Sequence, residues 1–176
     1  MRVFLVPSDP RWPEEFAREA SLLKDALGVH LLAIHHIGST AIPGIDAKPV
    51  IDFLAVADDL ARIDEQAGRV EALGYEAMGE FGIPGRRYFR KSDRSGDRTH
   101  QIHTFQAGSP QIERHLAFCA YLRAHPACAK EYEALKRRLA AQYPAGITSY
   151  SGGKDEFIKD VDAKAAAWRA QNRPEP

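Results

Sequence analysis

The order of secondary-structure patterns along the chain constrains its fold more than any other feature. Segments with strand-like character all end before residue 107, and from Ser109 onward apolar residues recur at helical spacing. A run of strands followed by a run of helices indicates an α+β fold, whereas a doubly wound parallel sheet needs the two to alternate. The sequence therefore predicts one domain, residues 1–176, with a sheet-containing core over 1–107 and a C-terminal helical part over 108–176.

Glycines and prolines divide the chain into individual elements. Five segments read as strands, the last two as a hairpin: "HLLAIHHIG", "PVIDFLAVA", "YEAMGEF", "RRYFRK" and "RTHQIHTF". Helices are predicted from Trp12 to Gly28, from Asp58 to Gly74, from Ser109, from Pro126 and from Lys154. The segment "TSYSGG" before the last helix reads as a loop. We thus expect a sheet of about five strands flanked by helices, with further helices at the C-terminal end.

The composition narrows the classes of function. The chain is 44% hydrophobic and 27% charged, and its 24 basic and 24 acidic residues give no net charge. A neutral chain lacks the electrostatic footprint of a nucleic-acid-binding protein, so nucleic acid ranks lowest among the possible partners. The N-terminal apolar run is too short for a signal peptide, and no window is apolar enough for a membrane span. These features predict a cytoplasmic protein without membrane contact.

One carboxylate, Asp52, interrupts the otherwise apolar strand "PVIDFLAVA". A lone ionised carboxylate among apolar residues is disfavoured unless a cation or hydrogen-bond donors compensate it. Two alternatives satisfy that requirement. Asp52 forms an ion pair with an arginine or lysine or accepts from loop amides, or it binds a hard cation such as Mg²⁺, which takes carboxylate oxygens together with water and phosphate.

The turn Gly38-Ser39-Thr40 ends the preceding strand and leads towards Asp52. Glycine lets the backbone approach a ligand closely, and exposed amides with two hydroxyl groups suit phosphate oxygens. The same three residues also suit an ordinary turn. Lys48, just before the strand, is either a solvated lysine or a phosphate contact.

Alternation along the strands separates the other candidate residues. His103 shares a face with Gln101 and Phe105, while His100 points the other way, which disfavours a zinc site made from the two histidines. The predicted hairpin "GRRYFRKSDRSGDR" is rich in basic residues: Arg86, Arg87, Arg90, Lys91, Arg94 and Arg98. In this basic hairpin Arg87 points away from Arg86, so at most half of the six cations line one site. Lys154 opens the last helix, where a lysine is slightly unfavourable to the helix dipole, which favours an anion-binding role.

Six segments together carry a resemblance to a known family: "VPSDPRWPEEF", "HIGSTAIPGIDAKPVIDFLAV", "GRRYFRK", "RTHQIHTF", "HLAFCAYLRAHP" and "YSGGKDEFI". Each is similar to a stretch characteristic of the GrpB family, also called UPF0157. That family is placed in the polymerase-β-like nucleotidyltransferase superfamily. The resemblance spans nearly the whole chain and implies a nucleotidyltransferase-like mixed sheet.

The resemblance also implies roles for particular residues. In the superfamily a Gly-Ser turn holds a triphosphate, two acids separated by one residue bind Mg²⁺, and a third acid lies on a neighbouring strand. Gly38 and Ser39 match the turn, and Asp52 matches the first acid. Leu54 stands at the position of the second acid, and His103 stands where the third is expected. The resemblance therefore implies one Mg²⁺ on Asp52, with His103 or Glu80 as a further ligand.

Two hypotheses of function follow. In the first, the protein is a nucleotidyltransferase that binds ATP or another nucleoside triphosphate with Mg²⁺ and transfers a nucleotidyl group to a small acceptor that the sequence does not identify. His103 is then a metal ligand or a general base, and the phosphates are held by Gly38, Ser39, Thr40, Lys48, Arg86, Arg87 and Lys154. In the second, a degenerate module binds a nucleotide or phosphometabolite without chemistry. The sequence leaves the oligomeric state open.

Overall fold

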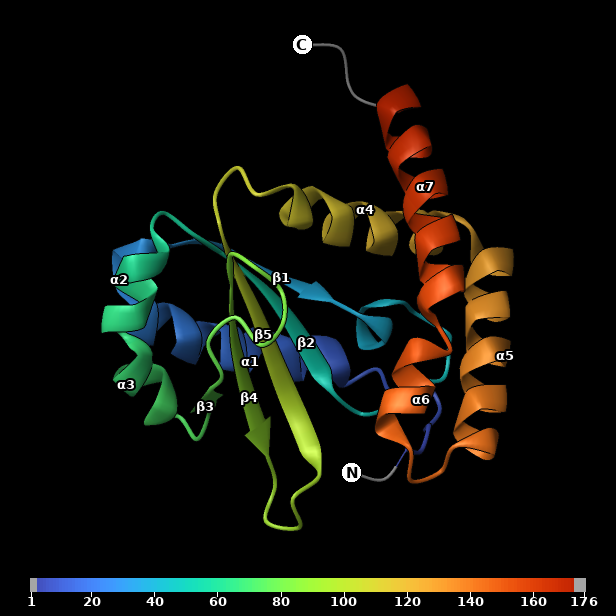
Figure 1. The fold of residues 1–176 in the computed structure, drawn as a ribbon, viewed down its shortest axis with the longest axis horizontal. Helices are drawn as coiled ribbons and strands as arrows, with labels where there is room; N and C mark the ends of the chain where they lie inside the picture. The colour runs from blue at the N-terminus through green and yellow to red at the C-terminus, as the bar shows by residue number, and fades with distance from the viewer. Residues whose placement is uncertain (1–2, 173–176) are drawn as a thin grey trace.

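A computed structural model describes residues 3–172 and places five strands in one mixed sheet of order β1-β2-β5-β4-β3 (Figure 1). The strands are β1 Leu31–Ile37, β2 Ile51–Ala57, β3 Glu76–Ala77, β4 Arg86–Ser92 and β5 Arg98–Gln106. β2 and β5 run parallel, and the other neighbouring pairs run antiparallel. The predicted α+β class and the β4–β5 hairpin are confirmed, although β3 spans only two of the seven residues in "YEAMGEF".

Seven α-helices surround the sheet within the described residues: α1 Trp12–Leu27, α2 Leu60–Glu65, α3 Ala67–Glu71, α4 Pro110–Ala124, α5 Pro126–Gln142, α6 Ile147–Gly152 and α7 Asp155–Gln171. Side-chain caps mark the first residues of two of these helices. The Ser109 side chain accepts the N–H of Gln111 at the start of α4, and Asp59 does the same for Ala61 at the start of α2. Such caps satisfy amides that have no partner within the helix.

Two predictions of local structure are wrong. The helix expected from Asp58 to Gly74 is broken at Gln66, whose backbone conformation (φ −92°, ψ 0°) leaves the helical region. The first five residues of "TSYSGG" belong to helix α6 rather than to a loop. Tyr150 explains the second error, because its side chain is 2% exposed and packs in an apolar cluster with Val3 and Leu139, so tertiary burial stabilises a turn that is locally rich in loop formers.

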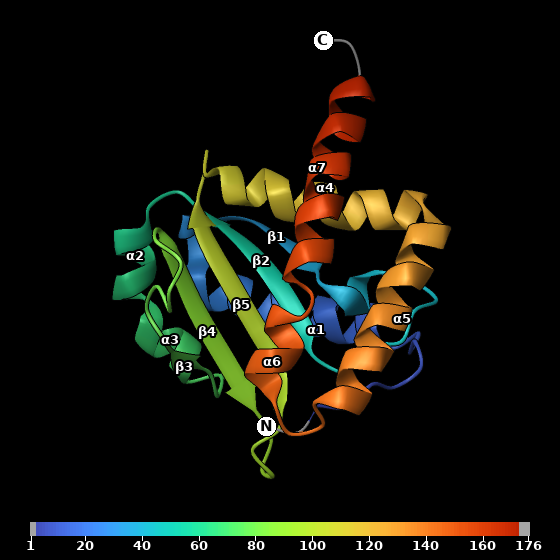
Figure 2. The same cartoon turned by 45° about the vertical axis from the view of Figure 1, so that its right-hand side comes forward.

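The two faces of the sheet have different coverings. Phe53, Ala55 and Ala57 of β2 point into the main apolar core, which α1 and the α2–α3 region cover. Leu54 points to the other face and packs against Cys119 of α4. Figure 2 shows α1 behind the sheet and α6 and α7 in front of it. Asp52, two residues before Leu54, therefore faces the C-terminal helices.

The C-terminal helices also enclose the connection between β1 and β2. Ile42 and Ile45 of that connection are buried in a cluster with Leu122, Tyr132 and Val161, which come from α4, α5 and α7. This packing fixes the backbone that follows Gly38 against the helices. Within residues 3–172, no helix has the length and apolar character needed to cross a membrane.

Candidate functional site

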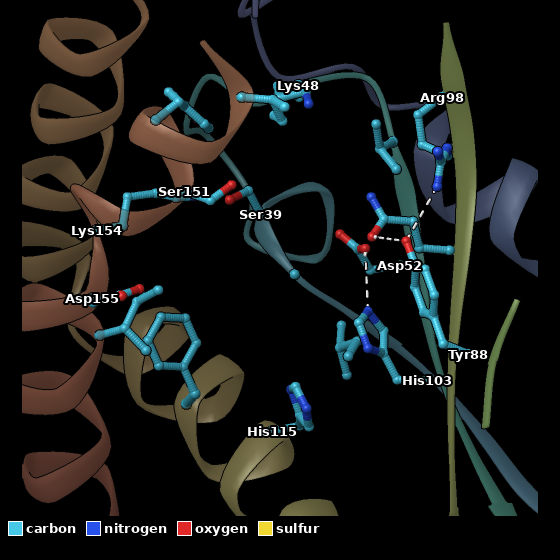
Figure 3. A pocket seen from close by; sticks show the side chains of 18 of the residues that line it. Ser39, Lys48, Asp52, Tyr88, Arg98, His103, His115, Ser151, Lys154 and Asp155 are labelled. Atoms are coloured by element: carbon cyan, nitrogen blue, oxygen red, sulfur yellow. Dashed lines mark hydrogen bonds and ion pairs between the residues drawn. The ribbon is translucent and has the colours of Figure 1, made fainter. Parts of the chain in front are cut away.

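A pocket of about 980 Å³ lies between the sheet face that carries Asp52 and the C-terminal helices (Figure 3). Its walls come from the turn after β1, from β2, β4 and β5, and from α4, α6 and the start of α7. The pocket brings together six of the residues predicted from the sequence: Gly38, Ser39, Lys48, Asp52, His103 and Lys154.

Gly38 and Asp52 are in direct contact at the base of this pocket. Gly38 has φ +73°, and a Cβ atom added to it would overlap the Oδ2 atom of Asp52 and lie 3.0 Å from its Cβ. Register explains the proximity, because the neighbouring Ile37 pairs directly with Asp52 across β1 and β2. Glycine is therefore needed at this position both for the left-handed backbone and for the approach of the carboxylate.

The two hydroxyl groups of the turn have different environments. Ser39 lines the pocket together with Tyr132 of α5. Thr40 is 5% exposed; its hydroxyl donates to the carbonyl of Val50 at 3.1 Å and pairs with His36 Nε2 at 2.9 Å. The side-chain donor of Thr40 therefore holds the turn against β2, and the phosphate contact expected from this residue stays a prediction.

His103 is held between a carboxylate and a guanidinium. Its Nε2 lies 3.8 Å from Asp52 Oδ1, and its Nδ1 lies 3.3 Å from Nη1 of Arg86. A guanidinium only donates hydrogen bonds, so Nδ1 must accept, and the neutral ring then carries its proton on Nε2, towards Asp52. Arg86 itself is 6% exposed and lies behind His103 instead of lining the pocket. The predicted direct phosphate contact from Arg86 is therefore corrected.

Five cationic side chains line the pocket. Two of them, Arg90 and Arg114, form ion pairs with Glu76 and Asp162, and the other three are Lys48, Arg98 and Lys154. Burial, and secondarily the charge of Lys154, lowers the pKa of Lys48 to about 8, while burial also lowers the pKa of Lys154. Lys154 lies at the N-cap of α7, with its ammonium 4.5 Å from the centre of the Tyr150 ring. Arg98 donates to the Tyr88 hydroxyl at 3.2 Å, and its buried Nε has no hydrogen-bond partner among the described residues. An anion in the pocket would compensate all three cations.

Two residues expected at the site lie elsewhere. Arg87 makes a bidentate ion pair with Asp64 at 2.6 and 2.8 Å, on the face of the sheet that α2 covers. The Glu80 carboxylate accepts the N–H of Gly85 at 2.7 Å and thereby closes its own loop. The structure thus corrects the phosphate contact predicted for Arg87 and the metal contact considered for Glu80.

Sequence reasoning missed two residues that line the pocket. Arg98 is one of the cations of the basic hairpin, and nothing in the sequence distinguishes it from the others. In the structure it lies opposite Ser92 at the hairpin end and lines the pocket. His115 of α4 lies 5.6 Å from the His103 ring, and burial lowers its pKa to about 3, so it is neutral at physiological pH. Helical periodicity alone gave no reason to separate His115 from the core positions of α4.

The donor set limits how a metal ion can bind. Residues 3–172 contain no group of three or more His, Cys, Asp and Glu side chains arranged around a possible metal position. Leu54, at the expected position of a second acid, is fully buried in an apolar cluster. A single carboxylate fits Mg²⁺, which keeps water and takes phosphate oxygens as its other ligands. It does not fit a two-metal site, which needs several bridging carboxylates.

The chain is similar to known proteins over nearly its whole length. The family model described as "GrpB protein" matches residues 2–164. The UPF0157 protein YqkA of Bacillus subtilis (strain 168) is 45% identical over 168 residues, which make up 96% of this chain and 48% of that protein. The chain therefore spans about half the length of that relative.

Two solved structures have a similar fold. The crystal structure of the conserved protein GrpB from Enterococcus faecalis superimposes with a TM-score of 0.87 at 43% identity, covering 92% of this chain and 96% of that one. The Cid1 poly(U) polymerase superimposes with a TM-score of 0.53 at 13% identity, covering 78% of this chain and 44% of that one. The second likeness shows a shared nucleotidyltransferase-like fold alone. The chain belongs to the GrpB family.

Proposed function

We propose that the pocket binds a nucleoside triphosphate with one Mg²⁺ and that the protein transfers a nucleotidyl group to a small acceptor. One observation carries the proposal: the carboxylate of Asp52, held against the Gly38 turn, faces a pocket that also presents Lys48, Arg98 and Lys154. A carboxylate that lies near an arginine and two lysines, both with pKa values lowered by burial, suits a polyanion that arrives with its own cation. The Cid1 polymerase, which shares the fold, was crystallised with MgGTP bound.

Each residue of the pocket has a distinct role in this proposal. Asp52 would hold Mg²⁺, which supplies positive charge to the phosphate oxygens when bound. Lys48, Lys154 and Arg98 neutralise the remaining charge of the triphosphate, and Ser39 orients it from the turn. In the transfer, an acceptor oxygen attacks the α-phosphorus, the bond to the bridging β-phosphate oxygen breaks, and pyrophosphate leaves with the electron pair. The acceptor's proton passes to solvent.

The role we propose for His103 is neither metal ligand nor general base. Because Arg86 donates to Nδ1, the neutral ring presents an N–H at Nε2 and has no free lone pair for a metal or a proton. We propose that the N–H at Nε2 of His103, 3.8 Å from Oδ1 of Asp52, instead attracts that carboxylate electrostatically and keeps it aimed into the pocket. Asp52 is then the single protein ligand of the cation.

A second candidate is a module that binds a nucleotide without chemistry. The buried Leu54 favours it, since an apolar cluster occupies the place where the superfamily has a second metal-binding acid. In that case the cationic side chains of the pocket contribute more than the metal to binding the phosphates.

Calorimetric titration with ATP, GTP, CTP and UTP, with and without Mg²⁺, separates the two candidates. Binding that requires Mg²⁺ supports the transferase and justifies a search for the acceptor by pyrophosphate release. Binding of equal strength without the metal supports the module, and the absence of binding to any of the four contradicts both.

A further inference from the structure

Phe81 is unusual in both its backbone and its exposure. Within residues 3–172 it is the only non-glycine residue with positive φ (+44°). It lies in a loop where Gly79, Gly82 and Gly85 also have positive φ. Its side chain lines the pocket and is 54% exposed. An aromatic residue persists in a left-handed conformation only where its surroundings enforce it, and such strain is concentrated at ligand-binding sites.

Arg86 is the residue that enforces this conformation. Its Nη2 donates to the carbonyl of Phe81 at 2.7 Å, and its Nε donates to the carbonyl of Glu80 at 3.2 Å. The same guanidinium reaches Nδ1 of His103 through Nη1. One buried cation therefore ties the Phe81 loop to the histidine that faces Asp52.

The ring of Phe81 begins a row of aromatic rings along one wall of the pocket. It stacks on Tyr88, with ring centres 5.2 Å apart and planes 18° apart. The Tyr88 ring lies 5.4 Å from the ring of His103, and Figure 3 shows Tyr88 beside His103 and Asp52. The row thus runs from the exposed rim to the carboxylate proposed to hold the cation.

We infer that Phe81 is a stacking platform for the base of the nucleotide, an inference that rests on the function proposed above. Tyr88 covers one face of its ring, and the residue is 54% exposed where it lines the pocket, so the ring is open to a ligand there. A planar base gains stacking energy there whatever its identity. The ligand is therefore a nucleoside polyphosphate and not an acyclic phosphometabolite, which has no ring to stack.

The test compares ATP with inorganic tripolyphosphate, both with Mg²⁺, by calorimetric titration. Phe81→Ala should weaken ATP binding about tenfold, the effect of losing one base–aromatic stack, and leave tripolyphosphate binding unchanged. Phe81→Tyr should restore ATP binding because it keeps the ring. Leu32→Ala is the matched control, since Leu32 is also a large exposed side chain (57%) but lies on β1 outside the pocket. Melting temperatures of all variants confirm that they are folded.

The outcomes separate this inference from the proposed function. If wild type binds both probes and Phe81→Ala weakens both equally, or weakens neither, the stacking role is wrong while the phosphate site stands. If wild type binds ATP no more tightly than tripolyphosphate, the base makes no contribution and the inference is wrong. If wild type binds neither probe, the proposed function fails and the inference fails with it.

Discussion

Gly38 and Asp52 form one unit, because the carboxylate of Asp52 occupies the space that any side chain at position 38 would need. The sequence alone does not show that the turn after β1 and the charge in β2 are in contact. In the folded protein, a side chain at position 38 would displace the carboxylate of Asp52. This contact answers why a carboxylate stands in an apolar strand: its side chain points out of the sheet, against a backbone turn, and into a pocket with cationic walls.

Gly38→Ala should abolish Mg²⁺-dependent nucleotide binding and destabilise the protein. The new Cβ displaces Asp52, and a residue with a side chain at φ +73° costs about 1 kcal/mol or more of folding free energy. Gly108→Ala is the matched control, since Gly108 has φ +88° and no atom within 4 Å of an added Cβ. It should lower the melting temperature similarly but leave binding intact. Equal binding by the two variants would contradict the prediction.

The imidazole of His103 should be the Nε2–H tautomer in the neutral state. Arg86 donates to Nδ1, which fixes the proton on the other nitrogen. Long-range ¹H–¹⁵N spectra of labelled histidine distinguish the two nitrogens directly. In Arg86→Met the donor is lost, and we expect a mixture of tautomers. A dominant Nδ1–H form in the wild type would show that the assigned role of His103 is wrong.

Nucleotide binding should take up protons near pH 8. Burial lowers the pKa of Lys48 to about 8, so about half of this side chain is neutral there, and a bound polyphosphate raises that pKa by favouring the ammonium. Uptake should shrink towards pH 6.5, where Lys48 is already charged before the ligand arrives. Titrations in buffers of different ionisation enthalpy measure it. Lys48→Met should remove most of the uptake; an unchanged value in this variant would exclude Lys48 from the phosphate site.

Arg98 and Arg87 should differ sharply in their effect on binding, although both belong to the same basic hairpin. Arg98 faces the pocket with an Nε that has no hydrogen-bond partner within residues 3–172, whereas Arg87 is paired with Asp64 on the opposite face. Arg98→Met should weaken ATP binding about tenfold, the range for loss of a charge-assisted hydrogen bond. Arg87→Met removes a partly exposed ion pair worth under about 1 kcal/mol and should leave affinity unchanged. Similar losses in both variants would indicate a diffuse charge effect.

Much of the fold followed from local pattern. Period-2 alternation placed Arg86 and Arg87 on opposite faces and separated His103 from His100, as the structure shows. The Asp52 strand and the Gly38 turn were recognisable because a charge in an apolar run and a glycine at a strand end are both local signals.

The remainder of the site depended on contacts between distant segments. Helix α6 was missed because burial of Tyr150 against residues from α5 and the N-terminal segment decides it, and "TSYSGG" carries no helical pattern of its own. The environment of Thr40 likewise depends on His36 and Val50, which only the folded turn brings together. The link from Arg86 to His103 and to the strained Phe81 loop crosses two strands, so no spacing in the sequence signals it.

The most direct test of the account is the affinity of Asp52→Asn for ATP, measured with and without Mg²⁺ beside Asp155→Asn. Asp155 is an exposed acid that also lines the pocket, so its variant makes the same change of charge at a neighbouring position. We predict that Asp52→Asn loses the gain in affinity that Mg²⁺ gives the wild type, yet binds metal-free ATP at least as well, because one repulsive charge is gone. Asp155→Asn should keep that gain. If Asp52→Asn retains the full effect of Mg²⁺, Asp52 is not the metal ligand and the central claim is wrong.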